Sequence, residues 1–261
     1  MRQYLTALQD ILDLGERRTN RTGIDTISLY GYHMKFDLRR GFPAITTKKL
    51  MFKSVVRELL WFCRGETNIK TLGCGIWNSW ADENGEVPFC YGQMWRRWPG
   101  KEREVDQLAE LIQRMETDPN SRRHIINAWH PEFQDQAGLS WCHAFVQFKV
   151  TDEYVDCSLT QRSADAMLGV PFNIASYSLL TSMVARRIGR KPRWFNHFLN
   201  DFHIYVNHLD GVKEQLQRQP KDLPQLILRA DPKTELWDYR VEDVDLKNYE
   251  HHPAINLEVA V

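Results

Sequence analysis

The residues best suited to chemistry lie in the stretch Leu139–Val150 and in the segment after it, Cys157–Asp165. The first stretch contains Cys142 and the second contains Arg162. A thiol is a useful nucleophile at neutral pH only if its pKa is lowered, and a neighbouring guanidinium is one of the few means of doing so without a metal. Of the five cysteines, only Cys142 has such a neighbourhood readable from the sequence. We therefore take Cys142 as a candidate nucleophile, against the alternative of a buried strand cysteine.

The two stretches alternate in polarity, which predicts two antiparallel strands over residues 142–150 and 155–163. A turn centred on Asp152 and Glu153 places Cys142 opposite Ser163, with Arg162 diagonal to it. A slip of one residue would instead pair Cys142 with Arg162 or with Ala164. Each register brings a guanidinium close to the thiol.

A second group of residues has the composition of a phosphate site. A tight dianion site uses several guanidinium forks and a hydroxyl, and no glycine-rich phosphate loop offers an alternative. An arginine on a polar turn, such as the turn containing Arg21, is more often simply solvated. The candidate phosphate ligands are Arg21, Arg122, Arg123, Arg162 and Ser163.

Glu58 interrupts an apolar helix face. Valine, leucine and phenylalanine residues between 55 and 62 predict a helix that ends at Gly65. A carboxylate at the edge of such a face is costly to bury unless it is paired or functional. The structural alternative is a pairing of Glu58 with Arg57 or Arg64.

The remaining elements must position these groups. Asn173 stands at the start of a helix that Gly189 closes, where it could be simply a capping or turn residue. His203 and Tyr205 are expected to open a helical run that continues to about Leu216. Periodicity also predicts helices over 1–15 and 104–116, and strands over 26–32, 125–129 and 225–228.

Length and composition indicate one globular domain of 261 residues, 43% apolar and 26% charged. Thirty-four basic and thirty-four acidic residues give zero net charge, so no global field attracts nucleic acid or a membrane. An odd number of cysteines without a CxxC pattern argues against a disulfide framework or a structural zinc site. The N-terminus lacks a signal-like segment and no run of eighteen apolar residues occurs, so we expect a cytoplasmic protein.

Beyond these local patterns, the sequence resembles the thymidylate synthase family over essentially its whole length. Many motifs occur in the order that this family shows, which makes chance similarity negligible. They are Asn20–Gly23, Arg57–Phe62, Trp77, Trp80–Gly85, Tyr91–Gly92, Asp118–Arg123, Cys142–Phe145, Gln161–Asp165, Leu168–Tyr177, Asp201 with His203–Tyr205, and Ala260–Val261.

The resemblance implies an α/β fold of the α+β type. Residues 1–261 would form a single catalytic domain, with a twisted mixed β-sheet packed by long helices on one face. The other face would serve a homodimer. Each site would bind dUMP beneath 5,10-methylenetetrahydrofolate, with no metal, and no nucleic acid or membrane would be required.

The resemblance also implies roles for individual residues. Cys142 would add to C6 of the uracil, Glu58 would assist proton transfers through water, and Tyr91 would help to remove the C5 proton. Asn173 would recognise the O4/N3 edge of the base, which favours dUMP over dCMP. The other implied substrate ligands are His203 and Tyr205 for the deoxyribose, and, for the phosphate, Arg21, Arg162 and Ser163 with Arg122 and Arg123 donated by the partner subunit. The implied folate contacts are Trp77, Leu139, Asp165, Gly169, Phe172 and Val261.

Several positions depart from the family pattern around the C5 and folate side. Trp141 replaces the usual proline before the nucleophile, and Thr160 and Phe202 replace a tyrosine and a smaller residue. They leave open a dUMP 5-hydroxymethylase, in which water adds to the exocyclic methylene and tetrahydrofolate leaves unchanged. Trp77 and Val261, which would shield that methylene from water, favour the synthase. A homologue that only binds its own messenger RNA is the third alternative.

Overall fold

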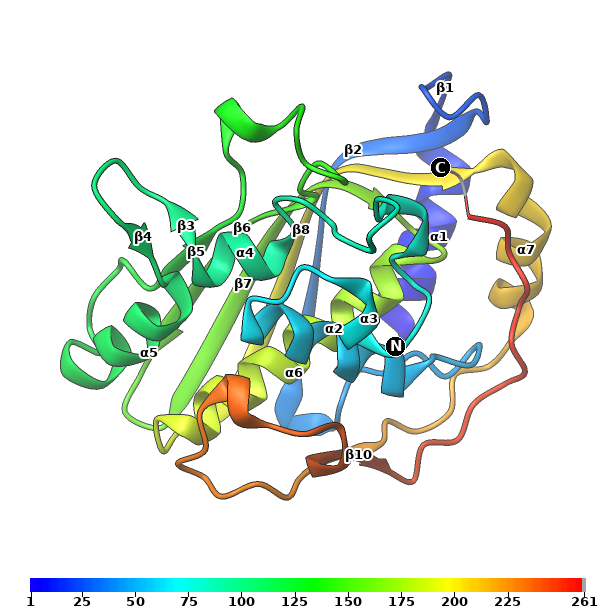
Figure 1. The fold of residues 1–261 in the computed structure, drawn as a ribbon. Helices are drawn as coiled ribbons and strands as arrows, with labels where there is room; N and C mark the ends of the chain where they lie inside the picture. The colour runs from blue at the N-terminus through cyan, green and yellow to red at the C-terminus, as the bar shows by residue number, and fades with distance from the viewer. Residues whose placement is uncertain (260–261) are drawn as a thin grey trace.

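The computed structural model describes residues 1–259, and a mixed β-sheet with helices against one face dominates it (Figure 1). Within these residues, six strands form the main sheet, in the order β1-β2-β8-β7-β6-β5. All neighbours are antiparallel except β7 and β8, which are parallel. The bounds are β1 Glu16–Arg18, β2 Thr26–Asp37, β5 Ile125–Asn127, β6 His143–Val150, β7 Tyr154–Asp165 and β8 Lys191–Tyr205. The predicted mixed sheet is confirmed.

Helix α6 (Gly169–Arg187) connects the parallel strands β7 and β8 and is almost entirely buried. Parallel strands need such a crossover, and Figure 1 shows this helix running across one face of the sheet, in front of the strands. The amphipathic helices α1 (Arg2–Leu14) and α2 (Phe52–Arg64) bury their apolar faces in the same core. The smaller elements are α3 Ile69–Leu72, α4 Tyr91–Arg96, α5 Gln107–Thr117, α7 Leu209–Gln217 and the strand pairs β3 Trp98–Pro99 with β4 Glu104–Val105 and β9 Gln225–Leu228 with β10 Val244–Lys247.

The opposite face of the sheet carries a row of partly exposed side chains. The row crosses β6, β7, β8 and β2: Phe145 pairs with Thr160, Thr160 pairs with Phe198, and Phe198 pairs with His33. The two phenylalanines are 37% and 41% exposed, and the His33 ring stacks on Phe198 at 4.4 Å. No helix of residues 1–259 covers this row, so an apolar strip is left open on the sheet.

The prediction of a helical run opened by His203 and Tyr205 is wrong. Both residues lie at the end of the fifteen-residue strand β8, and α7 begins only at Leu209. The sequence does not predict this strand because His197, on its buried face, breaks the apolar alternation. His197 is fully buried, and its Nε2 contacts Gln161 Oε1 at 2.8 Å, whereas its Nδ1 has no partner among residues 1–259.

The start of α6 also differs from expectation. The sequence predicts that the helix starts at Asn173, but it already begins at Gly169, so Asn173 lies inside the helix rather than at a cap. Pro171 is compatible with this position because amides of the first turn need no partner within the helix.

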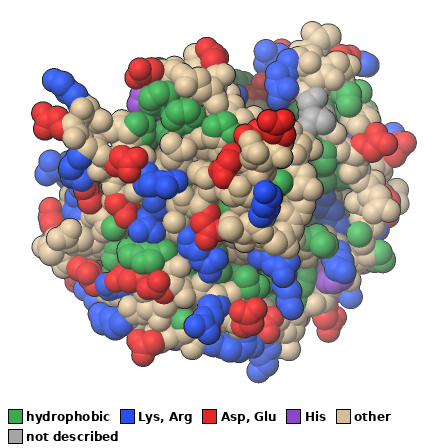
Figure 2. All heavy atoms as spheres, viewed as in Figure 1, with side chains coloured by type: hydrophobic (Ala, Val, Ile, Leu, Met, Phe, Trp, Pro, Cys, Tyr) green, Lys and Arg blue, Asp and Glu red, His purple; other side chains and the backbone are tan. Residues whose placement is uncertain are grey.

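The surface carries both charge signs. Figure 2 shows Lys and Arg side chains interspersed with Asp and Glu over one face, in keeping with the equal totals of the two classes. Every helix of residues 1–259 is too short or too polar to cross a lipid bilayer.

Candidate active site

Cys142 immediately precedes β6, where the pairing with β7 changes register. Phe145 pairs with Thr160, but His143 pairs with Gln161, so β6 contains one extra residue at Ala144. The amide of Arg162 consequently donates to the Cys142 carbonyl at 2.7 Å. The expected pairing with Ser163 is therefore wrong, and the one-residue slip toward Arg162 is what the structure shows. A β-bulge of this kind redirects a side chain at the end of a strand.

The guanidinium of Arg162 is fixed beside the thiol. Its NH2 group lies 3.6 Å from Cys142 Sγ and donates to the Ser140 carbonyl at 3.0 Å, while its Nε donates to the Trp141 carbonyl at 3.1 Å. The Trp129 ring lies 5.5 Å from the guanidinium carbon. These contacts hold a positive charge at the position where a thiolate would form.

Burial nevertheless raises the pKa of the Cys142 thiol above its usual value, although Arg162 and Arg21 act in the opposite direction. The arginines therefore lower the pKa as expected, but desolvation outweighs them. The thiol must lose its proton as it attacks, and the nearby guanidinium favours the charged form at that moment.

Tyr91 connects the thiol to α4. Its hydroxyl accepts the amide protons of Cys142 at 2.7 Å and of His143 at 3.1 Å. Burial raises the pKa of Tyr91 well above its usual range, so the phenol is neutral. Because both amides occupy its acceptor positions, the phenolic proton is left for donation elsewhere.

Asn173 belongs to a buried chain of amide contacts. Gln161 Nε2 donates to Asn173 Oδ1 at 3.0 Å, and Gln161 Oε1 contacts His197 Nε2 at 2.8 Å. Burial lowers the pKa of His197 well below its usual value, so its imidazole is neutral. The chain orients the Asn173 amide, which also forms a side-chain hydrogen bond with the buried His143.

Glu58 faces Trp77 rather than a cation. Trp77 Nε1 donates to Glu58 Oε1 at 2.7 Å, whereas Arg57 and Arg64 donate to backbone carbonyls. The alternative pairing of Glu58 with an arginine is wrong. Burial raises the pKa of Glu58 to about 7, with the Trp77 hydrogen bond opposing the shift. A carboxyl that is half ionised near neutral pH is well suited to proton transfer.

Glu58 and the thiol belong to one continuous network. The Trp77 and Tyr91 rings are edge to face at 6.1 Å, and Tyr91 reaches Cys142 as described above. The structure thus brings together residues that the sequence places more than eighty positions apart.

The expected deoxyribose and phosphate ligands lie at the neighbouring strand ends. Ser163 of β7 pairs with Asp201 of β8, and the Asp201 carboxylate lies 3.2 Å from His203 Nδ1. The Tyr205 ring is edge-on to His203 at 5.1 Å. Arg21 lies on the exposed turn before β2. Burial raises the pKa of both Cys142 and Tyr205, and the Arg21 charge opposes this rise at both groups.

Arg122 and Arg123 are not at this site. Both are exposed and precede β5, whose Ile125 pairs with Gln147 near the far end of β6. Five residues of strand separate Gln147 from Cys142, which is roughly 16 Å. Within one chain, these two arginines lie at a different place from the thiol.

The expected folate contacts surround the start of α6. Asp165 Oδ1 accepts the amides of Met167 at 2.9 Å and Leu168 at 3.3 Å, and Gly169 follows directly. Phe172 lines a cavity of about 300 Å³ with Lys48, Met51 and the segment 254–257. Leu139 is half-buried near the thiol, and Trp77 is buried. Val261 lies outside the described residues. Among residues 1–259, no group of three or more metal-ligating side chains is gathered.

Sequence reasoning assigned no role to Trp141, beyond its departure from the family pattern. Its fully buried indole donates to the Phe89 carbonyl at 2.7 Å, and Phe89 has a positive φ of 52°. Such a φ is uncommon for a residue with a large side chain. This hydrogen bond connects the chain directly before Cys142 to the loop before Tyr91. Its bulk packs into the core, as does that of Phe202, whereas Thr160 belongs to the outer row.

Comparison with known proteins adds a family assignment to this geometry. The family model described as thymidylate synthase matches residues 2–261. Proteins named thymidylate synthase from three strains of Coxiella burnetii, Dugway, RSA 331 and RSA 493, are each 52% identical to the chain over 265 residues. The alignments cover 100% of both chains.

Proposed function

The chain belongs to the thymidylate synthase family, and on this premise we propose that Cys142 is the nucleophile that attacks C6 of dUMP. The enzyme methylates dUMP to dTMP, and its family uses 5,10-methylenetetrahydrofolate as the one-carbon donor. The observation that carries the assignment is the Arg162 guanidinium held 3.6 Å from the Cys142 sulfur. Formation of the S–C6 bond moves electrons toward C5 and O4, which makes C5 nucleophilic toward the one-carbon unit.

Two groups are placed for the proton transfers. The C5 proton must leave after C5 has bonded to the one-carbon unit. Tyr91, held by the amides of Cys142 and His143, would assist by donating its phenolic proton to a water that takes the C5 proton. Glu58, with its pKa raised to about 7, exchanges protons with O4 through water. Loss of the C5 proton would break the bond between the one-carbon unit and the folate nitrogen and leave an exocyclic methylene on C5. Addition of a hydride, which tetrahydrofolate would supply, would give the methyl group, reform the C5–C6 double bond and break the S–C6 bond to release Cys142.

Asn173 and the strand ends would hold the nucleotide. The Asn173 amino group, oriented by Gln161, donates to O4 of uracil. His203 and Tyr205 bind the 3′-hydroxyl. The phosphate is bound by Arg21, Arg162 and Ser163. The folate is enclosed by Trp77, Leu139, Asp165, Gly169, Phe172 and Val261.

Arg122 and Arg123 would complete the phosphate site from a second subunit. Their distance from Cys142 in the same chain and the open row of Phe145, Thr160, Phe198 and His33 support a homodimer formed through this face. The close packing of α1, α2 and α6 on one sheet supports a single catalytic domain over residues 1–261.

The hydroxymethylase alternative is not favoured, because the full-length relatives are named thymidylate synthase. A direct assay tests the proposal. Enzyme, dUMP and methylenetetrahydrofolate are mixed, dihydrofolate is followed by absorbance, and the nucleotide is identified by mass. We expect dTMP and dihydrofolate in equal amounts. Hydroxymethyl-dUMP without dihydrofolate would refute the synthase reaction, and a Cys142→Ser variant that still turns over would refute the nucleophile.

A further inference from the structure

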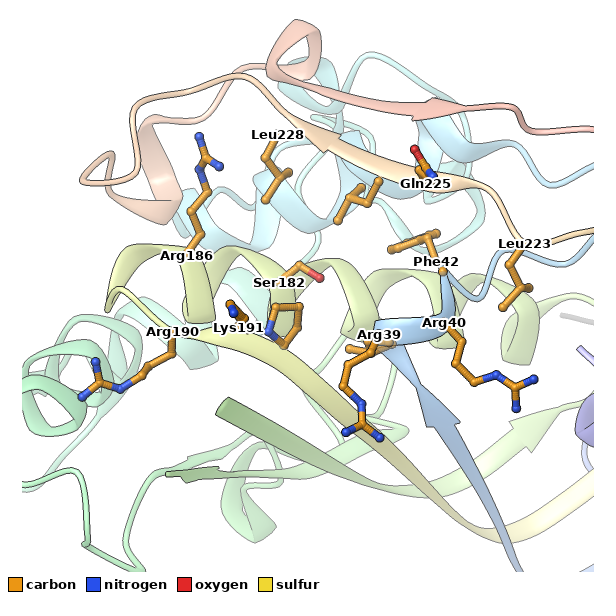
Figure 3. Close-up of a pocket in the computed structure, with 14 residues that line it drawn as sticks. Arg39, Arg40, Phe42, Ser182, Arg186, Arg190, Lys191, Leu223, Gln225 and Leu228 are labelled. Atoms are coloured by element: carbon orange, nitrogen blue, oxygen red, sulfur yellow. The ribbon is translucent and has the colours of Figure 1, made fainter. Parts of the chain in front are cut away.

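A second, basic groove lies far from Cys142, where η1 (Leu38–Arg40, after β2), α6, β8 and β9 meet (Figure 3). The groove borders Lys191 at the start of β8, whereas His203 and Tyr205 are at the end of that strand. Twelve residues of extended chain correspond to roughly 40 Å. The groove is therefore separate from the nucleotide and folate sites, and its volume of about 580 Å³ is that of a small-molecule pocket.

The charge of this groove has one sign. Five cations line it, and no aspartate or glutamate does: the cations are Arg39, Arg40, Arg186, Arg190 and Lys191. Asp37 neutralises Arg39 through two hydrogen bonds of 2.8 Å. Among residues 1–259, the other four form no salt bridge. Arg186 donates to the Ala230 carbonyl and contacts the Tyr239 hydroxyl, and Arg190 donates to the Gly189 carbonyl. In a chain of zero net charge, four uncompensated cations around one hollow form a local positive field.

The walls of the groove are apolar. Phe42 and Leu226 are partly or fully buried there, and the hydroxyl of the buried Ser182 is already used by the Ser178 carbonyl. In Figure 3, the arginines surround the groove and extend their guanidinium groups outward, away from Ser182. An anion at the rim could engage these flexible side chains, while an apolar body could rest on the walls. The buried Nε of Arg186 has no hydrogen-bond partner among the described residues.

We propose that this groove is a second ligand site of the enzyme, which binds a small phosphorylated molecule with an aromatic or apolar body. Guanidinium groups prefer phosphoryl oxygens because they can donate two parallel hydrogen bonds to them. The apolar walls select against inorganic anions alone. The volume of about 580 Å³ suits a nucleotide-sized ligand rather than a long polymer.

Calorimetric titration of the full-length enzyme tests the proposal. The active site is first saturated with dUMP, and adenosine triphosphate is then added at about 0.15 M salt, where weak non-specific attraction is screened. We expect one further saturable site per chain, which pyrophosphate fills at least tenfold more weakly. The double variant Arg40→Gln/Arg190→Gln should weaken adenosine triphosphate binding at least tenfold and leave the kcat for dTMP formation unchanged.

The matched control is Lys101→Gln/Arg103→Gln, which removes two exposed charges from the β3–β4 turn. It should bind adenosine triphosphate as the parent does. The absence of binding, or equal weakening in the two double variants, would refute a specific site. If a ten-nucleotide single strand of DNA binds more tightly than adenosine triphosphate and loses its affinity in the groove variant, the small-ligand proposal is wrong and the groove is part of a nucleic-acid surface.

Discussion

The Tyr91 hydroxyl lies 2.7 Å from the Cys142 amide nitrogen, so the backbone of the nucleophile is held by a residue from another element, α4. The same hydroxyl accepts the His143 amide. The position of the thiol and the position of the phenol are thus fixed relative to each other, and a change in one must affect the other.

Tyr91→Phe should lower kcat by about 10² to 10⁴, the usual contribution of a positioned acid or base. It should also lower the free energy of unfolding by about 1 to 3 kcal/mol, because two amides lose their acceptor. Steady-state assays and denaturant unfolding measure the two effects. Tyr177→Phe is the control: that hydroxyl is buried and has no partner among residues 1–259. Equal losses in both variants would contradict the role of Tyr91.

Glu58→Gln should alter the pH dependence of stability. The pKa of Glu58 rises from its ordinary 4.5 to about 7 on folding, so this carboxyl contributes stability below pH 4.5 that is lost as the pH rises through about 7. The parent should therefore lose about 3 kcal/mol more than the variant over that interval. Unfolding by denaturant at a series of pH values measures the difference.

Glu86→Gln provides a control of opposite sign. Hydrogen bonds from Asn68 and Thr67 lower the pKa of Glu86, so its contribution is present above its unfolded pKa and is lost as the pH falls. Parallel stability profiles for the parent and Glu58→Gln would show that Glu58 does not titrate near neutrality.

Asn173→Asp should exchange the base preference. Gln161 donates to the Asn173 oxygen, so the Asn173 amino group is the part that would donate to O4 of uracil. An aspartate carboxylate has no such donor, but it can accept a hydrogen bond from the amino group of cytosine. We expect kcat/KM for dUMP to fall by roughly 10² to 10⁴ and turnover of dCMP to become measurable. If the variant used dUMP like the parent and ignored dCMP, Asn173 would not recognise the base.

Trp141→Phe should reduce kcat by about tenfold while leaving KM for dUMP nearly unchanged, since the lost hydrogen bond to Phe89 holds the loop before Tyr91 rather than a nucleotide ligand. Trp95→Phe removes a similar volume from a buried indole whose nitrogen has no partner among residues 1–259. The decisive comparison is the kcat of the two variants. An identical loss of kcat in both would show that Trp141 acts only through its packing.

Mixing inactive subunits tests the donation of Arg122 and Arg123. Cys142→Ser and the double variant Arg122→Ala/Arg123→Ala should each be nearly inactive alone. After dissociation and reassembly of an equal mixture, half of the dimers are mixed and one of their two sites is intact, which restores about a quarter of the parent activity. No recovery in verified mixed dimers would place the arginines outside the partner's site.

The sequence predicts the longer helices α1, α2, α5 and α6 and the β6–β7 hairpin because each has a clear period and a clear turn, but it predicts neither α3 nor α4. It does not reveal β8, since the buried His197 is tolerated only through its contact with Gln161 from another strand. It does not fix the partner of Cys142 either, because the bulge at Ala144 has no glycine or proline to mark it. Cys142 and Arg162 could be paired from local spacing, but the contacts of Glu58 with Trp77 and of Trp141 with Phe89 depend on packing between distant segments.

The position of β8 between β2 and β7 has a consequence for biosynthesis. Residues of β2 pair with β8 residues that follow them by roughly 160 to 180 positions, so β2 leaves the ribosome long before its partner exists. Until then its edge is open to other chains. Ser163 of β7 meets His203 and Tyr205 only when β8 has been made and inserts between β7 and β2, so folding of the nascent chain and assembly of the nucleotide site should be one late event.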